Sequence, residues 1–220
     1  MQCGTCGNEQ LARDGQDWYC EFCHTRTRDV AVVATPSPVK SKPINRLMGS
    51  VLRLHIEDRV GTGFVISPKG LVLTNQHIVQ DQPTVTGSFD DSTEKYTLKV
   101  LYQGSDDTDL CLLKIISSKQ FEKIPFATQP PTLGEEVSTI GNPRGIGLSV
   151  SKGHISRLGD EGDLQLNLQL NPGNSGGPVL NQQGELVGII SFLIEEIQAM
   201  SFAIGLPQIE AFIEEAKGGQ

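Results

Sequence analysis

The feature that most constrains the fold is a succession of short apolar segments between residues 50 and 205, separated by turn residues. Segments rich in Val, Ile and Leu and divided by Gly, Pro, Asn and Ser predict β-strands at the spacing of a sandwich or barrel. After Pro207, apolar residues at helical spacing continue to Ala216 and predict a terminal helix. The fold class is therefore all-β with one C-terminal helix. The expected strands are residues 51–56, 64–66, 71–73, 98–102, 110–116, 137–140, 148–155, 164–168, 178–180, 186–192 and 201–204.

The cysteines divide the chain into two modules. Four of the five lie within the first 23 residues, as two Cys-x2-Cys pairs, and a stretch with three prolines follows at 35–43. Prolines separated by small polar residues are typical of a semi-extended linker. We therefore predict a small module at 1–30, a linker at 31–45 and a larger domain at 46–220.

The two cysteine pairs predict a zinc ribbon, in which Cys3, Cys6, Cys20 and Cys23 hold one tetrahedral Zn²⁺. So short a segment buries too little apolar surface to fold alone, so the metal would supply the folding free energy. A four-thiolate site has no open coordination position. The Zn²⁺ is therefore expected to be structural, and no cofactor is expected for catalysis. Two disulfides are the alternative, and they require an oxidising compartment.

Net charge and hydropathy argue against two classes of partner, nucleic acids and membranes. The formal net charge of -8 lies entirely in residues 46–220, with 13 basic and 21 acidic side chains. A domain of this charge repels phosphate, which argues against nucleic acid as its partner. No stretch reaches the ~18 apolar residues of a membrane span. The first residues, Met1 to Cys6, lack the regions of a signal peptide. We therefore predict a cytoplasmic protein with no membrane partner.

A glycine-rich turn at 173–178, Gly-Asn-Ser-Gly-Gly-Pro, is the strongest chemical motif. Glycines beside a serine allow a tight turn that aims backbone N–H groups at a developing oxyanion. Ser175 is the candidate nucleophile, and the amides of Gly173 and Ser175 are the candidate oxyanion donors. We include the intervening Asn174 in the same oxyanion turn. On its own, the string could be an ordinary glycine-rich turn.

Serine is a weak nucleophile at neutral pH and needs an adjacent base that a third group orients. His77 is the candidate base and Asp109 the candidate orienting acid. Alone, His77 could be a structural histidine and Asp109 a loop aspartate. The order His, Asp, Ser along the chain is that of the chymotrypsin triad, not of subtilisin or the α/β-hydrolases.

Residues 47–216 resemble the protease domain of the trypsin/chymotrypsin superfamily, and within it the HtrA/DegP branch. The resemblance rests on segments 61–66, 73–77, 108–110, 173–178 and 201–204, which follow in family order. It implies two six-stranded antiparallel β-barrels with the triad in the cleft between them. Asn174, where digestive trypsins have aspartate, favours the HtrA branch. HtrA enzymes usually carry PDZ domains after the protease, and we expect none here.

The resemblance also implies the substrate-binding residues. Ser191 is expected to face Asp109, and residues 191–193 (Ser191, Phe192 and Leu193) to pair with the substrate backbone. Leu193 stands where trypsin has glycine, and Gln169 where trypsin has its aspartate. An arginine or lysine side chain would be unpaired there. We therefore expect cleavage after small or medium apolar residues, unless positions 169 and 193 do not line the pocket.

Together these features predict a serine endopeptidase that acts on protein or peptide substrates. The zinc ribbon is expected to recruit a protein partner or to regulate the protease. The alternative is a zinc-ribbon adaptor protein whose protease fold is a catalytically silent scaffold. An intact triad argues against the alternative, since a silent scaffold is expected to lose a triad residue.

Overall fold

The computed structural model describes residues 11–14, 17–20, 26–27, 44–56, 59–89, 92–105, 107–168, 170–193 and 201–218. The chain divides into two compact units, Met1–Lys40 and Ser41–Gln220. In the first unit, β1 (Leu11–Asp14), β2 (Asp17–Cys20) and β3 (Arg26–Thr27) form a three-stranded antiparallel sheet.

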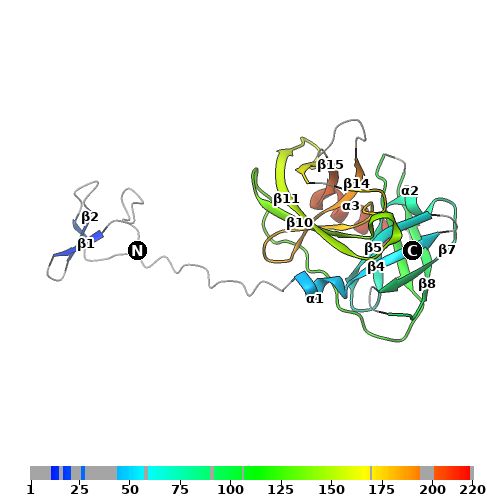
Figure 1. Ribbon diagram of the computed structural model, residues 1–220. Coiled ribbons are helices and arrows are strands. Elements are labelled where there is room, and N and C mark those ends of the chain that lie inside the picture. Colours follow the sequence, from blue (N-terminus) through cyan, green and yellow to red (C-terminus); the bar gives the residue numbers. More distant parts are fainter. Residues whose placement is uncertain are drawn as a thin grey trace. The chain divides into compact units, whose positions relative to one another are not determined.

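The second unit contains two closed six-stranded antiparallel barrels, each following its own stretch of chain (Figure 1). The all-β prediction and the two barrels implied by the family resemblance are therefore confirmed. The first barrel consists of β4 (Val51–Ile56), β5 (Arg59–Ser67), β6 (Leu71–Thr74), β7 (Thr84–Phe89), β8 (Tyr96–Gln103) and β9 (Cys111–Ile115). The second consists of β10 (Glu136–Gly141), β11 (Ser149–Leu158), β12 (Leu164–Asn167), β13 (Pro178–Leu180), β14 (Leu186–Leu193) and β15 (Ser201–Gly205).

Strands that are apolar throughout contribute side chains to two different cores, because successive side chains point to opposite faces. In β9, Cys111 and Leu113 belong to the core cluster of the first barrel. Leu112, between them, belongs with the second-barrel residues such as Ile189. Successive side chains point to opposite faces of a strand, so a strand buried on both faces is apolar throughout. One face of β9 thus fills its own barrel and the other packs toward the second barrel.

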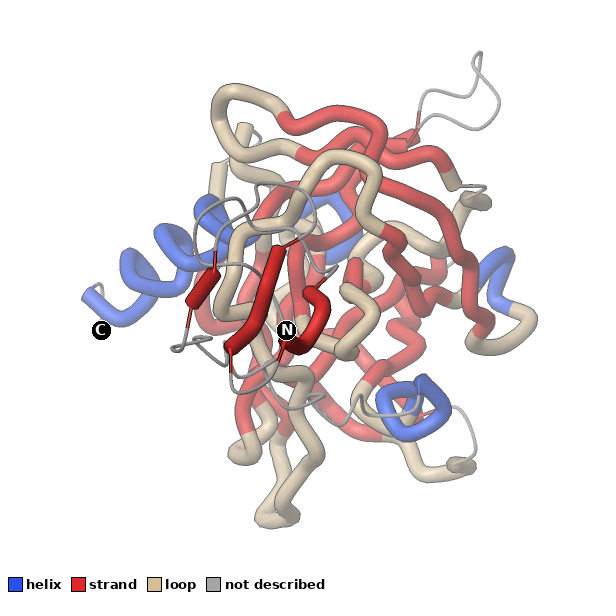
Figure 2. The backbone as a smooth tube through the Cα atoms, turned by 90° about the vertical axis from the view of Figure 1, so that its left-hand side faces the viewer, coloured by secondary structure: helices blue, strands red, loops and turns tan. Residues whose placement is uncertain are grey.

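The helices are short except the last, which lies beside the C label at the left of Figure 2. They are α1 (Ile44–Met48), α2 (Gln76–Val79), the 3₁₀ turn η1 (Pro143–Gly145) and α3 (Leu206–Gly218). The predicted C-terminal helix is thus confirmed. α3 packs on β14 and β15, and its Phe212 ring lies 5.3 Å from the ring of Tyr102 on β8. Within the described ranges, no helix is long and apolar enough to cross a membrane.

Three elements differ from the expectation. β7 was not predicted, because Gly87 and two threonines interrupt its apolar pattern. A Cβ on Gly87 would lie 2.9 Å from Leu98 Cδ1 and 3.2 Å from Leu52 Cδ2, so barrel packing leaves room only for hydrogen there. The four-residue helix α2 and the five-residue helix α1 are too short to show a helical period. Helix α1 begins at Ile44, inside the range predicted as linker.

Candidate active site

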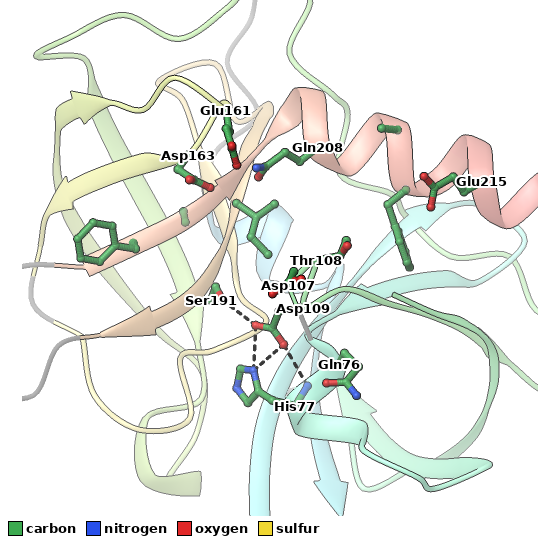
Figure 3. Close-up of a pocket in the computed structure, with 15 residues that line it drawn as sticks. Gln76, His77, Asp107, Thr108, Asp109, Glu161, Asp163, Ser191, Gln208 and Glu215 are labelled. Atoms are coloured by element: carbon green, nitrogen blue, oxygen red, sulfur yellow. Dashed lines mark hydrogen bonds and ion pairs between the residues drawn. The ribbon is translucent and has the colours of Figure 1, made fainter. Parts of the chain in front are cut away.

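The imidazole of His77 is oriented by Asp109. His77 lies in α2, directly after β6, and its Nδ1 is 2.8 Å from Asp109 Oδ1 and 2.9 Å from Oδ2 (Figure 3). The backbone N–H of His77 donates to Oδ1 of the same carboxylate at 3.1 Å. A carboxylate on Nδ1 fixes the tautomer that leaves Nε2 without a proton. His77 is exposed, so Nε2 is accessible to a substrate.

Asp109 is held in an unusual conformation by three other groups. Its φ is +47°, a left-handed region that aspartate tolerates better than most residues. The Asn75 side chain donates from Nδ2 to the Asp109 carbonyl at 3.0 Å, and the Asp109 amide donates to Ser105 O at 2.9 Å. Ser191 on β14 donates from Oγ to Asp109 Oδ2 at 2.6 Å. The carboxylate therefore accepts hydrogen bonds from both barrels.

Ser175 lies in a turn that requires glycine at two positions, 173 and 176. Gly173 and Gly176 have φ values of +100° and +80°. A Cβ on Gly176 would lie 2.0 Å from the carbonyl oxygen of Thr62 on β5. Thr62 also donates its backbone N–H to Ser175 O at 3.1 Å and its Oγ1 to Gly173 O at 2.7 Å. The first barrel therefore holds the turn that the second barrel supplies.

Two amides of the turn remain available to an oxyanion. Within the described residues, neither Gly173 nor Ser175 donates its backbone N–H to another group. Arg144 N–H donates to Pro172 O at 2.8 Å. C=O and N–H point in opposite directions in a trans peptide, so this bond turns the Gly173 N–H away from η1. The inclusion of Asn174 is corrected: its N–H is already bonded to Asn171 O at 3.1 Å, which closes the turn.

Two cavities meet at His77. One, of about 350 Å³, also contains Ser175, so the structure brings the candidate base and nucleophile to one cavity. No hydrogen bond joins them in the part of the chain that the structure describes. Such bonds are often long without substrate. This cavity is lined by Arg59, Val60, His77, Ile78, Arg144, Pro172, Gly173 and Ser175. The other, of about 720 Å³, contains Asp109 and Ser191 together with the carboxylates of Asp107, Glu161, Asp163 and Glu215 (Figure 3).

A family model described as a trypsin-like peptidase domain matches residues 61–189, which is more than half of the chain. The chain belongs to the trypsin-like peptidase family. Within that family it is similar to DegP-like and DegS proteases. It is 37% identical over 147 residues to a probable periplasmic serine endoprotease, DegP-like, of Chlamydia trachomatis. It is 33% identical over 168 residues to the serine endoprotease DegS of Salmonella typhimurium.

These alignments cover 61% and 71% of this trypsin-like chain, but only 28% and 46% of the two relatives. Among solved structures, a serine endoprotease from Yersinia pestis superimposes with a TM-score of 0.73 at 29% identity, over 79% of this chain and 64% of that one. Rv3671c of Mycobacterium tuberculosis, in an inactive form, gives the same TM-score at 22% identity over 86% and 97%, which supports the fold alone. The relatives' names support the prediction of a serine endopeptidase.

The prediction of a cytoplasmic location was wrong by this comparison. The DegP-like relatives are named periplasmic, which points to the periplasm. The prediction rested on the first residues of the chain. The matched region is a trypsin-like barrel pair, whose fold is independent of compartment.

Seven of the predicted site residues lie outside the residues or side chains that the structure describes. Cys3, Cys6, Cys23 and Gln169 lie outside the described residues. Cys20, Phe192 and Leu193 lie in strands whose backbone alone is described there.

Sequence reasoning missed several residues that build this trypsin-like site. Thr62 donates to the backbone of the Ser175 turn and Asn75 to the backbone of Asp109, and Arg59 and Arg144 line the cavity of Ser175. Thr62 and Asn75 stand in segments 61–66 and 73–77 that carried the resemblance, so a signal was present. The arginines are 85 positions apart, and only the fold brings them together.

Proposed function

We propose that this chain is a serine endopeptidase that works through His77, Asp109 and Ser175. The observation that carries the proposal is the pair of short Nδ1–carboxylate contacts of His77, a residue that lines the same cavity as Ser175 and whose Nε2 is left to act as the base. Support also comes from the two unbonded amides of the glycine turn and from the named endoprotease relatives.

In the proposed reaction, Ser175 Oγ attacks the carbonyl carbon of the scissile amide while Nε2 of His77 takes the hydroxyl proton. The negative charge that develops on the carbonyl oxygen is bound by the N–H groups of Gly173 and Ser175. The C–N bond then breaks, and His77 gives its proton to the leaving amine. Water attacks the acyl-enzyme with His77 again as base, which releases the acid and restores Ser175. Asp109 keeps its charge throughout and stabilises the imidazolium.

Covalent labelling tests the nucleophile without knowledge of the substrate. A fluorophosphonate probe is expected to modify Ser175, as mapped by mass spectrometry, and the label should disappear in Ser175→Ala. Ser138→Ala is a matched control, because Ser138 is also a serine of the second barrel but lies in β10 and lines neither cavity. Lack of any label on the folded chain would move the assignment to the adaptor alternative.

For specificity, we propose cleavage after small or medium apolar residues, based on the resemblance at Gln169 and Leu193. Protein or peptide substrates would pair with residues 191–193. A peptide-library profile is expected to show Ala, Val or Leu before the cleaved bond. Dominance of Arg or Lys there would contradict it.

We propose that the first unit is a zinc ribbon, with Cys3, Cys6, Cys20 and Cys23 as ligands. A separate compact unit with a three-stranded sheet, in which β2 ends at Cys20, supports this. The periplasmic names of relatives make the disulfide alternative more relevant, because that compartment is oxidising. Native mass spectrometry distinguishes the two: one added zinc ion supports the ribbon, and a loss of four hydrogens supports two disulfides.

The ribbon is proposed to recruit a partner or regulate the protease. Removal of residues 1–40, the whole first unit, tests this. The truncation stops before α1, because Leu47 of that helix is buried in the core of the second unit and is needed for folding. A changed rate on one small peptide indicates regulation. An unchanged peptide rate with slower cleavage of a protein substrate indicates recruitment, and no change in either rate contradicts both.

A further inference from the structure

The smaller cavity lies where the amine product would leave. The larger cavity contains Ser191 of β14, the strand proposed to bind the acyl part of the substrate. The smaller cavity takes no lining residue from β14 or β15 and shares only His77 with the larger one. Its walls come from β5, η1, α2 and the turn of Ser175. A peptide that runs along β14 to Ser175 therefore continues into this cavity with the residues that follow the scissile bond.

Two arginines, Arg59 and Arg144, line this cavity, in a domain that carries an excess of negative charge. Arg59 donates from Nη2 to the side-chain oxygen of Gln80 at 2.7 Å. Gln80 is neutral, so this bond orients Arg59 without neutralising it. Arg144 is exposed, and no carboxylate within the described residues forms an ion pair with either arginine. The two arginines therefore bring two positive charges to this cavity.

The backbone around the arginines is fixed. Arg144 has a φ of +54° and is tied to Pro172 O through its N–H. A Cβ built on the next residue, Gly145, would lie 3.4 Å from the side chain of Val60, so η1 packs on β5 beside Arg59. Val60 and the buried Ile78 add apolar wall. The cavity thus offers two cations beside an apolar surface, an arrangement that suits a carboxylate on a short aliphatic stem.

We propose that this cavity selects substrates with a carboxylate within the first two residues after the scissile bond. The inference rests on the proposed protease function and extends it to the leaving-group side. The carboxylate can belong to an Asp or Glu side chain or to the C-terminus of a short substrate, since the guanidinium groups bind both alike. Bidentate pairing of arginine with a carboxylate favours Glu or Asp in the substrate over Gln, Asn or Lys.

The test uses the full chain and matched peptides. A peptide library digested by the chain first gives a cleaved sequence. That peptide is then made with Glu, Gln or Lys at the first or second position after the cleaved bond, each with a free and an amidated C-terminus. The kcat/KM for Glu is expected to exceed that for Gln by about fivefold at low salt, with Lys lowest, and the ratio should shrink as salt screens the charges. If the C-terminal carboxylate is the ligand, amidation of a short peptide causes the same loss.

Substitution assigns the effect to the arginines. Arg144→Gln and Arg59→Gln are each expected to lower the Glu-to-Gln ratio, and the double variant to bring it close to one. The Arg144 backbone bond to Pro172 does not depend on the side chain, so the oxyanion turn should survive. Lys123→Gln is the matched control, because it removes one exposed positive charge outside both cavities.

The outcomes are distinguishable. Equal rates for Glu and Gln peptides, together with no effect of C-terminal amidation, overturn this inference alone when Ser175 of the same enzyme is labelled by the fluorophosphonate. So does a Glu preference that the double variant retains. Absence of both labelling and cleavage overturns the proposed function and this inference with it. The labelling reagent does not extend into the cavity as a peptide does, so its result is independent of leaving-group recognition.

Discussion

The hydroxyl of Ser191 donates a 2.6 Å hydrogen bond to Oδ2 of Asp109 and joins the second barrel to the first at the candidate active site. Asp109 precedes β9, whereas Ser191 lies on β14. The carboxylate that orients His77 is thus itself oriented from the opposite barrel. The pair makes the catalytic geometry depend on how the two barrels dock.

Ser191→Ala tests that dependence. A hydrogen bond to a charged group contributes about 1.5–3 kcal/mol, so its loss should lower kcat/KM roughly tenfold to a hundredfold. Ser201→Ala is a matched control, since Ser201 also donates a buried hydroxyl, to Leu168 O at 3.1 Å, but has no bond to Asp109. Equal activity losses in the two variants would contradict a specific role for Ser191.

Asp109→Asn should keep the shape of the site and remove its charge. An amide can still accept from the His77 backbone but favours the wrong imidazole tautomer, and kcat should fall on the order of 10³–10⁴-fold. Asp107→Asn, which alters a carboxylate of the same cavity, should change kcat little. The measurement is steady-state cleavage of one peptide by both variants. A loss of similar size in Asp107→Asn would mean that cavity charge, not His77 orientation, matters.

Thr62→Val should loosen the turn of Ser175. The Thr62 hydroxyl donates to Gly173 O at 2.7 Å and accepts from Asn142 N–H at 3.0 Å, both buried. Removing it strands buried polar groups at a cost of roughly 1–3 kcal/mol. Chemical denaturation should show this loss, together with slower fluorophosphonate labelling. Thr62→Ser keeps the hydroxyl and should match the wild type closely in stability and labelling rate. If Thr62→Ser lost as much stability as Thr62→Val, the methyl group of Thr62 would be responsible instead of the hydroxyl.

Gly87→Ala should destabilise the first barrel. The added Cβ would meet Leu98 Cδ1 at 2.9 Å in a closed core, and overpacking of this kind costs about 1–3 kcal/mol. Gly218→Ala, near the C-terminus, has no atom within 4 Å of the new Cβ and should be neutral. Thermal unfolding of both variants makes the comparison. A neutral Gly87→Ala would show that β7 moves to admit the methyl group.

Cys111 should make stability fall at high pH. Burial raises the pKa of its thiol to about 12. In the unfolded chain the pKa is about 8.5, so the unfolded state alone ionises as the pH rises between these values. Each pH unit in that window should cost about 1.4 kcal/mol of unfolding free energy from this group, and none below it. Cys111→Ala should remove the contribution of this thiol to the fall of unfolding free energy with pH. In the unsubstituted chain, iodoacetamide should modify Cys111 only after unfolding.

Much of this site could be predicted from sequence because local patterns specify it. The Ser175 turn needs its glycines in one continuous segment, and His77 and Asp109 lie within short motifs. The sequence pattern does not predict which amides of the oxyanion turn are free. Asn174 lies inside the motif, but its N–H donates to Asn171 O. Only the folded turn shows which amides stay unbonded.

The remaining features depend on tertiary packing. Gly87 looks like a strand breaker until Leu98 and Leu52 surround it. Arg59 and Arg144 look like ordinary surface arginines until β5 and η1 come together. The location could not be predicted from the barrels, because their packing is the same in any compartment.

The order in which the second barrel closes has a consequence for the cell that makes this chain. β15, Ser201–Gly205, pairs with both β12 and β14 and is the last of the six strands of the second barrel to be synthesised. Ser175 therefore emerges from the ribosome well before the barrel that shapes its turn is complete. A half-made chain carries the three side chains of the proposed triad but no finished site, so the proposed protease is expected to stay inactive during its own translation and not to cleave other unfolded proteins.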